Sequence, residues 1–446
     1  MTTAVRRAAA YALVGCLALV GPWVLGVQEP AVATVAAIAP FLLVAAIALV
    51  IPADNVLFEL FARPRDRRMG TLYGLTIFSL VAAGLATLTV GFGMPTHVYV
   101  GTILLLVFGN LAGQLVRAYV YEQVRATAAF VTGGFLAACA GQLLTVSVDG
   151  TGVDGPTIAF LAASGALFAA LLQQLMLQRD DALVMVNVAL MLWLFSSLPL
   201  DISPTRITVA LVVTVVLGYA SFALDTASLP GMLTGVLLGL LTIVLGDYGW
   251  FAMLIAFFGI GGLSSKFRYD RKRERGIAQE NEGARGTGNV LANSLVALVA
   301  VLGAAISPEF GISKAVFFYA FAGAVGAALA DTLSSEIGGL YDNPRLITTF
   351  EVVEPGTDGA VTWQGELVGV AGAAFIAGIG LVAFDETAAL GAGAIVFAGF
   401  VGMTVDSILG ATIEGRLCGN QGVNFLATVA AALAGGGLAH ALELTF

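Results

Sequence analysis

The chain of 446 residues has few cysteines and histidines, the residues that build disulfide frameworks and zinc sites. Cys16, Cys139 and Cys418 lie far apart, so they predict neither a disulfide framework nor a metal cage. The two histidines, His97 and His440, are isolated, and we interpret both as incidental polar residues. No Gly-x-x-x-x-Gly-Lys-Ser/Thr pattern occurs, which excludes a Walker-type phosphate loop.

Charge is also scarce. Charged residues make up 11% of the chain and hydrophobic residues 59%, and the mean hydropathy is +0.94. Soluble domains do not have this composition. The net charge is −9, and lysine is rare among the 20 basic residues. Such a chain has no broad basic face, which argues against nucleic acid as a partner. The low lysine content together with the surplus of acidic residues is typical of proteins in a high-salt cytoplasm.

Long apolar segments run from one end of the chain to the other. Runs near 20 apolar residues span a bilayer, and each must be a helix because lipid cannot satisfy open backbone groups. We therefore predict an all-α, polytopic membrane protein with about fifteen transmembrane helices. The predicted spans are 8–27, 31–51, 72–93, 97–118, 126–148, 156–177, 183–198, 206–222, 228–246, 248–264, 289–306, 314–332, 364–383, 386–406 and 424–443.

The basic residues predict the orientation of these spans. If the N-terminus is cytoplasmic, only Arg206 and Lys314 among the 20 basic residues lie outside, as the positive-inside rule requires. The first span is too long for a signal-peptide core, and we interpret it as a retained anchor. We expect a multi-pass protein of the cell membrane with its N-terminus inside and its C-terminus outside.

The two halves of the chain differ in character. Residues 1–226 hold about eight spans with no acidic residue deep in a span and no chemical motif, so we interpret them as a scaffold module of unknown function. Residues 227–446 hold about seven spans and all the candidate functional residues. We place the boundary in a short inside loop near Leu229–Gly231.

The densest polar clusters of the second half fall in four stretches, 266–293, 331–362, 406–416 and 420–424. An ionisable residue in or beside hydrocarbon is costly, and by default it indicates a functional site. All four stretches face the cytoplasm under the predicted topology. We therefore expect one site at the inner membrane surface, facing a ligand that is half lipid and half phosphate.

The first stretch begins at Lys266 and ends with Arg285-Gly-Thr-Gly-Asn289, with Asn293 one helical turn later. Glycines before a helix N-terminus let the backbone approach an anion, and the exposed N–H groups favour phosphate. Arg285 could add a bidentate phosphate contact. The alternative is a cytoplasmic loop whose arginines follow the positive-inside rule and bind no ligand, and this explains residues 271–275 well.

The second stretch places Asp331 and Ser335 on one helical face, with Glu336 beside it. Carboxylates and hydroxyls are ligands that Mg²⁺ prefers, together with substrate phosphates. A solvated helix end is the alternative. Asp406-Ser407 in the third stretch repeats the pattern of an acid and a hydroxyl at the inner end of a span.

The loop after the second stretch carries Arg345, Thr348 and Thr349, followed by Gly356-Thr357-Asp358-Gly359, which has turn chemistry. Two interpretations stay open. The loop is a flap over a nucleotide, with Arg345 on phosphate, or a plain hairpin tip, since residues 348–353 alternate like a strand. Asn424 in the fourth stretch repeats the position of Asn289, either as a pseudo-repeat or by chance.

Five motifs in order resemble one family. They are Arg285-Gly-x-Gly-Asn289, Asp331-Thr-x-x-Ser335-Glu336-x-Gly338, Pro344-Arg345-Leu-Ile-Thr348-Thr349, Pro355-Gly356-Thr357-Asp358-Gly359-x-Val-Thr362 and Asp406-Ser407-x-Leu-Gly410-Ala411. Over about residues 215–446 the chain resembles the integral membrane proteins of domain-of-unknown-function family 92, which includes plant phytyl-phosphate kinase. The departures are small: Ala330 and Ala360 stand where glycine is usual, Ser334 where alanine is usual, and Asp358 where asparagine is usual.

The resemblance implies phosphoryl transfer from a nucleoside triphosphate, with CTP as the expected donor, to an isoprenyl monophosphate such as geranylgeranyl or phytyl phosphate. Mg²⁺ is the implied cofactor. We expect Asp331, Glu336 and Asp406 to bind the metal, with Arg285 as the fourth catalytic residue. The expected substrate and nucleotide ligands are Lys266, Asn289, Asn293, Ser335, Arg345, Thr348, Thr349, Gly356, Thr357, Asp358, Gly359, Ser407 and Asn424.

Three other functions compete with this one. A transporter of a lipid or phosphorylated solute would suit the span count and the glycine-rich helices, but its charged groups would lie near the midplane rather than at inner ends. An assembly or lipid-scaffold protein explains the first half but not the polar motifs. A nucleotidyltransferase acting on a lipid phosphate needs nearly the same residues as a kinase, and the sequence does not separate the two.

Overall fold

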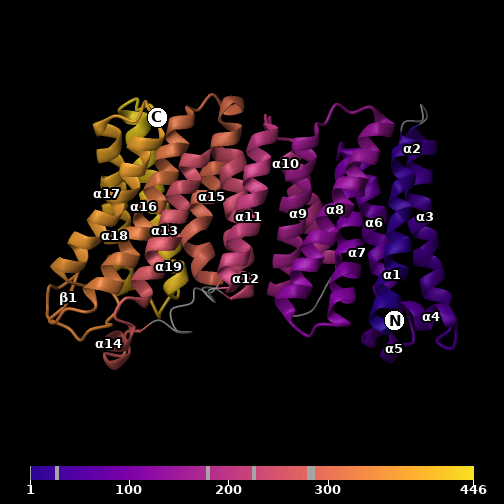
Figure 1. The fold of residues 1–446 in the computed structure, drawn as a ribbon, viewed down its shortest axis with the longest axis horizontal. Coiled ribbons are helices and arrows are strands. Elements are labelled where there is room, and N and C mark those ends of the chain that lie inside the picture. Colours follow the sequence, from indigo (N-terminus) through magenta and orange to yellow (C-terminus); the bar gives the residue numbers. More distant parts are fainter. Residues whose placement is uncertain (1, 26–29, 177–180, 224–227, 279–286) are drawn as a thin grey trace. The chain divides into compact units, whose positions relative to one another are not determined.

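The computed structural model describes residues 2–25, 30–176, 181–223, 228–278 and 287–446. The chain divides into two compact helical units, Met1–Thr208 (unit 1) and Val209–Phe446 (unit 2), coloured from indigo to yellow along the chain in Figure 1. The division falls in the first turns of α11, Pro204–Ala223, whereas we had placed the boundary after this helix, at residues 226 and 227.

Unit 1 consists of helices and short turns of helix. Its elements are α1 (Thr3–Gly15), η1 (Cys16–Val20), α2 (Gly21–Leu25), α3 (Pro30–Val50), α4 (Val56–Phe61), α5 (Pro64–Met69), α6 (Tyr73–Phe92), α7 (Thr96–Arg117), α8 (Gln123–Asp149), α9 (Gly155–Leu175), α10 (Asp181–Ser196) and the start of α11. Some helix starts are capped by a side chain: the Asp154 carboxylate accepts from the Thr157 N–H at 3.0 Å at the start of α9.

Helix α7 is the central helix of unit 1, packing against α1, α8, α9 and α10. Val100, Ile103 and Leu105 on it are fully buried. Glycines of α8 allow the closest approach, because a Cβ atom at Gly134 would lie 3.0 Å from the Leu105 carbonyl oxygen. Small residues let membrane helices pack at short range without a hydrophobic driving force.

Unit 2 holds the remaining helices and one short pair of strands. Its elements are α11, α12 (Leu229–Leu241), the π-helical turn η2 (Thr242–Gly246), α13 (Tyr248–Lys266), α14 (Tyr269–Glu274), α15 (Thr287–Phe310), α16 (Lys314–Gly338), β1 (Arg345–Leu346), β2 (Ala360–Val361), α17 (Trp363–Ala383), α18 (Ala389–Thr412) and α19 (Asn420–Ala441). The strands pair antiparallel, with Arg345 opposite Val361.

Helix α16 is the core of unit 2 and packs against α13, α15, α17, α18 and α19. Its middle is built of alanine and glycine, which brings the neighbouring backbones close. A Cβ atom at Gly402 of α18 would lie 2.4 Å from the Cβ of Ala327 on α16 and 2.9 Å from that of Ala431 on α19. This packing draws the polar ends of three helices together.

Thirteen helices in the described part of the chain are long and apolar enough to cross a membrane, judged by length and composition. The shorter apolar helices Thr34–Val50 and Asp181–Ser196 match the other two of the fifteen predicted spans. The prediction of a polytopic helical membrane protein is thereby confirmed.

The two ends of unit 2 carry different groups. Phe446 stacks on Phe318, near the start of α16, with ring centroids 4.3 Å apart. The strands and α14 lie at the opposite end of unit 2, beyond the last turn of α16 (Figure 1). The C-terminus and the loop of residues 356–359 therefore lie at opposite ends of the unit, as the predicted topology requires of them.

Candidate active site

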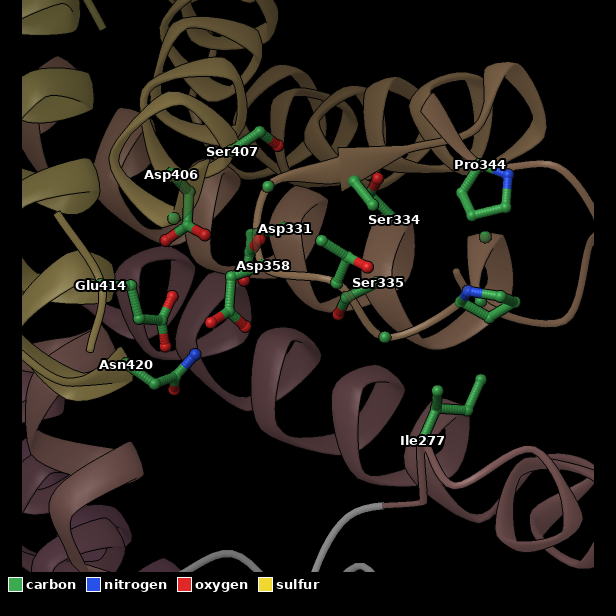
Figure 2. A pocket seen from close by; sticks show the side chains of 18 of the residues that line it. Ile277, Asp331, Ser334, Ser335, Pro344, Asp358, Asp406, Ser407, Glu414 and Asn420 are labelled. Carbon is green, nitrogen blue, oxygen red and sulfur yellow. The ribbon is translucent and has the colours of Figure 1, made fainter. Parts of the chain in front are cut away.

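Unit 2 contains a cavity of about 410 Å³ at the end that carries the strands (Figure 2). All four polar stretches contribute to it, although the first and the last of them are more than a hundred residues apart in the sequence. The polar side chains of its described lining are Asn293, Asp331, Thr332, Ser334, Ser335, Thr357, Asp358, Thr362, Asp406, Ser407, Glu414, Asn420 and Asn424. We call this space the acidic cavity.

Two carboxylates, which we call the inner pair, lie side by side in the cavity: Asp331 on α16 and Asp406 on α18 (Figure 2). They meet because α16 and α18 pack together along their length and each carries its acid near the same end. The Oδ2 atom of Asp406 is buried and has no hydrogen-bond partner in the described part of the chain. Two adjacent carboxylates with an unsatisfied oxygen are stabilised by a bound cation or a shared proton.

A second pair of carboxylates, the outer pair, is formed by Asp358 in the loop and Glu414 just after α18 (Figure 2). Partial burial and the charge of Asp358 raise the pKa of Glu414, and a hydrogen bond with Asn420 opposes this shift. Asn420 in turn accepts from Asn424 Nδ2 at 3.5 Å. The Asn424 side chain is 9% exposed, and its Oδ1 atom has no hydrogen-bond partner among the described residues.

The charge of this cavity is strongly one-sided. No lysine or arginine is found among its described lining residues, which include four carboxylates. Within the described ranges no three side chains of His, Cys, Asp and Glu converge closely enough to hold a metal by themselves. A site of this kind suits a hard cation that takes one or two carboxylates and completes its shell with water or the oxygens of a bound ligand.

Hydroxyl groups line the face of α16 that looks into the cavity. Ser335 Oγ donates to the Thr332 carbonyl at 3.1 Å, and Ser407 Oγ of α18 donates to the Met403 carbonyl at 3.3 Å. Because each hydroxyl gives its proton to the helix backbone, its oxygen lone pairs remain available to a ligand. Ser334, which we noted only as a departure from the family pattern and not as a ligand, joins them in the lining.

The loop of residues 355–360 closes one side of the cavity. Gly359 has a φ of +74°, and a Cβ atom there would lie 2.5 Å from both the Ala411 nitrogen and the Ser407 oxygen. Only glycine fits this backbone conformation and this contact with α18. Thr357 and Asp358 at the turn thereby reach the lining.

Of the two interpretations that the sequence left open, the structure shows the hairpin, and the flap over a nucleotide stays a prediction. The loop is a hairpin, held by the β1–β2 pair, and its tip lies along the cavity. Residues 348–353, which alternate like a strand in the sequence, do not form one. A turn follows β1, and Val352 makes only an isolated bridge to Arg345, because the partner strand of β1 is β2.

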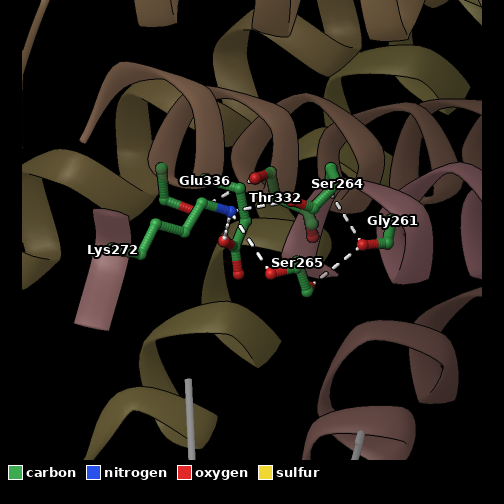
Figure 3. Close-up of polar contacts among 7 residues, drawn as sticks. Gly261, Ser264, Ser265, Lys272, Thr332 and Glu336 are labelled. Atoms are coloured by element: carbon green, nitrogen blue, oxygen red, sulfur yellow. Dashed lines mark hydrogen bonds and ion pairs between the residues drawn. The ribbon is translucent and has the colours of Figure 1, made fainter. Parts of the chain in front are cut away.

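Glu336 is not among the described lining residues of the acidic cavity, which corrects our expectation for the metal site. Figure 3 shows it beside Lys272 instead. Its carboxylate is bound by the ammonium of Lys272, which also donates to the carbonyls of Ser264 at 2.7 Å and Ser265 at 3.4 Å. Lys272 is 1% exposed and Glu336 5%. Lys272 is thus a buried ion-pair partner rather than a solvated member of an arginine-rich loop.

Several other expected ligands lie away from the acidic cavity. Lys266, Arg345, Thr348 and Thr349 are exposed and are not among its described lining residues. The Arg345 guanidinium donates to the Phe350 carbonyl at 2.7 Å instead, so it stabilises its own loop. These placements correct the expected phosphate and nucleotide contacts of all four residues.

Two expectations lie outside the described residues: Arg285 and the side chain of Asn289. The described residues next to them show that the starts of α15 and α19, which we compared as a pseudo-repeat, are close in space. A Cβ atom at Gly288, near the start of α15, would lie 2.2 Å from the amide of Gln421, near the start of α19. The two similar helix N-termini therefore lie directly side by side.

Sequence reasoning missed Lys272, Glu414, Asn420 and the segment 276–278, which also lines the cavity. Glu414 and Asn420 lie inside two of the polar stretches, so ranking every acid and amide of these stretches would have found them. Lys272 carried no signal, since a buried and a solvated lysine look alike in a basic run.

The comparisons with known proteins match the part of the chain that contains this cavity. A family model described as "Integral membrane protein DUF92" matches residues 212–432, which include α16, α18 and the loop between β1 and β2. The uncharacterized membrane protein MJ0933 of Methanocaldococcus jannaschii is 35% identical over 207 residues, which cover 46% of this chain and 82% of the relative.

Two relatives come from Arabidopsis thaliana. Protein PGR is 31% identical over 232 residues, covering 47% of this chain and 79% of the relative. Protein VTE6, chloroplastic, is 29% identical over 190 residues, covering 42% of this chain and 57% of the relative. No solved structure matches the chain. The matched region, the identities and the coverage together establish that this chain belongs to the integral membrane protein DUF92 family.

Proposed function

We propose that the protein is a membrane-embedded prenyl-phosphate kinase, which transfers the terminal phosphoryl group of a nucleoside triphosphate to an isoprenyl monophosphate. The observation that carries this proposal is the acidic cavity at the ends of α16 and α18, inside the region that matches the family model. The family includes plant phytyl-phosphate kinase, and its member VTE6 is similar to this chain.

The position of the cavity suits an amphiphilic substrate. Its polar lining lies at the ends of helices that are otherwise apolar, so a prenyl chain can lie among the helices while its phosphate reaches the carboxylates. A transporter would need its polar groups near the middle of the spans. Asp331 and Asp406 lie instead near the ends of their helices, which favours an enzyme over a transporter.

A divalent cation fits the inner pair. Asp331 and Asp406 would hold it, and the buried, unpartnered Oδ2 of Asp406 is the atom that most needs such a partner. Mg²⁺ there would supply charge neutralisation for the phosphate oxygens of the bound nucleotide. The four carboxylates of the cavity would otherwise repel a polyphosphate.

The reaction needs little covalent chemistry from the protein. An oxygen of the prenyl phosphate forms a new P–O bond to the γ-phosphorus, the bond between the γ-phosphorus and its bridging oxygen breaks, and the nucleoside diphosphate leaves with that electron pair. No proton has to be removed from a dianionic phosphate, so positioning and charge neutralisation supply the catalysis. Hydroxyls of Ser335 and Ser407 and the amides of Asn293 and Asn424 would orient the phosphates.

The loop of residues 356–359 would cover the nucleotide with its backbone and the Thr357 hydroxyl. CTP is the donor that we expect from the family resemblance. Positive charge for the phosphates would come from the Arg285 guanidinium, and backbone N–H donors would come from the paired helix starts near Gly288 and Gln421, since helix N-termini favour anions.

We place the cavity on the cytoplasmic side of the cell membrane, because the basic residues predict an internal N-terminus. Single cysteines introduced at Thr357 and at Asp385 test this placement. An impermeant thiol reagent added outside intact cells should label position 385 and leave position 357 unlabelled. The opposite pattern would place the cavity outside.

The activity is tested by incubating the purified protein with geranylgeranyl phosphate, Mg²⁺ and each nucleoside triphosphate in turn, with the products identified by mass. We expect geranylgeranyl diphosphate, formed fastest with CTP. A product that has gained a nucleoside monophosphate would instead identify a nucleotidyltransferase. Absence of any product with all four nucleotides, from protein that binds the lipid, would contradict both.

A further inference from the structure

Unit 1 contains a cavity of its own, of about 370 Å³. It is formed by α1, α6, α7, the start of α10 and the turn before α5, and we call it the basic cavity. Its apolar wall consists of Ala4, Ala8, Phe78, Leu106 and Val107. The side chains of Arg7 and Arg63 also line it. An apolar wall next to two guanidinium groups is an amphiphilic arrangement.

Arg63 already has a counter-ion. Its Nη2 atom lies 2.6 Å from Asp181 Oδ2, with the two side chains 27% and 24% exposed. Its guanidinium also lies over the ring of Tyr11, 5.0 Å from the centroid. Arg63 is thus held in place by an ion pair and a cation–π contact.

Arg7 has no counter-ion. Its Nη1 atom donates to the Ala62 carbonyl at 3.1 Å, and in the described part of the chain no carboxylate lies within ion-pair distance of it. The neighbouring Asp66 is 2% exposed and uses both oxygens on backbone groups, the N–H of Arg63 at 2.9 Å and that of Gly74 at 3.0 Å. Asp66 therefore acts on Arg7 only through its charge, and among the described residues the Arg7 guanidinium has no direct ion-pair partner.

A guanidinium beside an apolar wall, without a direct ion-pair partner among the described residues, favours an anionic ligand. Arginine matches phosphate with two parallel N–H donors, and it is more weakly hydrated than lysine, so it suits a partly dry site. Arg7 lies near the start of the candidate span Thr3–Val24, and long basic side chains near the ends of membrane helices reach toward the polar interface. The wall of Phe78, Leu106 and Val107 would bury an attached hydrocarbon chain.

We infer that the basic cavity of unit 1 binds an anionic amphiphile by its phosphate group, which pairs with Arg7, while the hydrocarbon chain lies against α6 and α7. The amides of Asn110 and Gln114, one helical turn apart on α7, supply further donors to the head group. The inference stands apart from the proposed kinase reaction, because it uses only residues of unit 1.

Photolabelling of the full-length protein in nanodiscs of phosphatidylcholine tests this inference. The probe is a prenyl monophosphate with a diazirine in its chain, and the adducts are mapped by mass spectrometry. We expect adducts on the peptides that carry Phe78, Leu106 or Val107. Arg7→Met should raise the probe concentration that gives half-maximal labelling by roughly 10- to 100-fold, the effect of losing a hydrogen bond to a charged group.

Matched variants separate the site from general effects. Arg65→Met removes an exposed arginine of α5 that does not line the cavity, and it should leave the labelling unchanged. Arg7→Lys keeps the charge and should retain part of the affinity. Asp331→Asn should leave these adducts unchanged, so that a failure of the kinase proposal is told apart from a failure of this one. Thermal unfolding midpoints of all variants establish that each is folded.

Competition identifies the source of the phosphate. Displacement by phosphatidylglycerol or by unlabelled geranylgeranyl phosphate supports an amphiphile. If inorganic phosphate displaces the probe as well as the lipids do, the cavity binds free anions and the inference about the chain is overturned. Labelling of α6 and α7 that is equally strong in Arg7→Met and in the unaltered protein, or no labelling there at all, would overturn the inference as a whole.

Discussion

The two cavities of this protein are opposites in charge and lining. The acidic cavity of unit 2 has four carboxylates and no basic side chain among its described lining, whereas the basic cavity of unit 1 has two arginines, one aspartate and an apolar wall. A carboxylate site binds a phosphate only through a cation, but an arginine site binds it directly. The two proposals rest on this difference: metal-assisted chemistry is proposed for unit 2, and binding of a ligand without its transformation is inferred for unit 1.

The largest expected effect comes from the inner pair. Asp331→Asn and Asp406→Asn keep the side-chain shape and remove the charge, so each should lower the rate of product formation by about 100-fold or more, since ~1.4 kcal/mol of transition-state stabilisation corresponds to tenfold. The measurement is the initial rate with geranylgeranyl phosphate, CTP and saturating Mg²⁺.

Asp385→Asn is the matched control, because Asp385 is an exposed acid in the loop between α17 and α18 at the other end of unit 2. It should keep the rate within about twofold, the scatter expected of a surface change. Near-normal turnover in both inner-pair variants would contradict the proposal that Asp331 and Asp406 bind a catalytic cation. The functional contrast between the two cavities would then be weaker.

The next effect compares the ion pairs of the two units. The Lys272–Glu336 pair is buried, and loss of one partner leaves a buried charge, so Lys272→Met should lower the free energy of unfolding by about 3–5 kcal/mol. The Arg63–Asp181 pair is about a quarter exposed, so Arg63→Met should cost roughly 1 kcal/mol. Chemical unfolding in detergent measures both.

A double variant sharpens this prediction. Lys272→Met combined with Glu336→Gln removes both charges, and it should recover part of the stability that Lys272→Met alone loses. If Lys272→Met and Arg63→Met lower the free energy of unfolding equally, the deeper burial of the Lys272–Glu336 pair does not make its loss more costly. The stability argument for unit 2 would then fail, while the activity argument would stand.

A smaller effect concerns the loop over the acidic cavity. Gly359→Ala adds strain at a positive φ and a collision with α18, which together should cost about 1–3 kcal/mol and raise the KM for the nucleotide. Gly150 in unit 1 also has a positive φ, +70°, but a Cβ atom there would meet nothing within 4 Å. Gly150→Ala therefore measures the strain alone. A KM that rises equally in both variants would contradict the role of the loop.

The fold and much of the site could be predicted from the sequence because both leave local signals. Apolar runs and the positions of basic residues predicted the spans. Acids and amides at the inner ends of helices predicted that Asp331, Asp406 and Asn424 belong to one region, since a polar residue beside hydrocarbon needs a reason.

The rest depended on tertiary contacts that leave no local signal. Lys272 and Glu336 are 64 residues apart, and nothing in either segment indicates the pairing. We expected Arg345 to bind phosphate, but its guanidinium donates a hydrogen bond to the Phe350 carbonyl of its own loop. The basic cavity of unit 1 was missed because its lining comes from five separate segments, none of which has a motif.

The smallest expected effect is the titration of Glu414 in the outer pair. Partial burial and the charge of Asp358 raise its pKa above the ordinary value of 4.5 in the folded protein. The protonated form is therefore favoured by folding, and this contribution to stability is present below pH 4.5 and is lost as the pH rises through the folded-state pKa. Glu414→Gln should thus match the unaltered protein at low pH and exceed its stability at neutral pH. The gain should be at most about 0.5 kcal/mol, because a largely solvent-accessible charge is screened.

Thermal unfolding midpoints from pH 4 to pH 8, measured without divalent cations, test this sign for the unaltered protein, Glu414→Gln and Asp358→Asn. Asp358→Asn removes the repulsion and should reduce the pH dependence in the same way. Added Mg²⁺ should reverse the order at neutral pH, since only the carboxylates gain from the cation. If Glu414→Gln is the less stable protein at neutral pH even without Mg²⁺, the outer pair is not a site of repulsion. The acidic cavity would then owe its character to Asp331 and Asp406 alone.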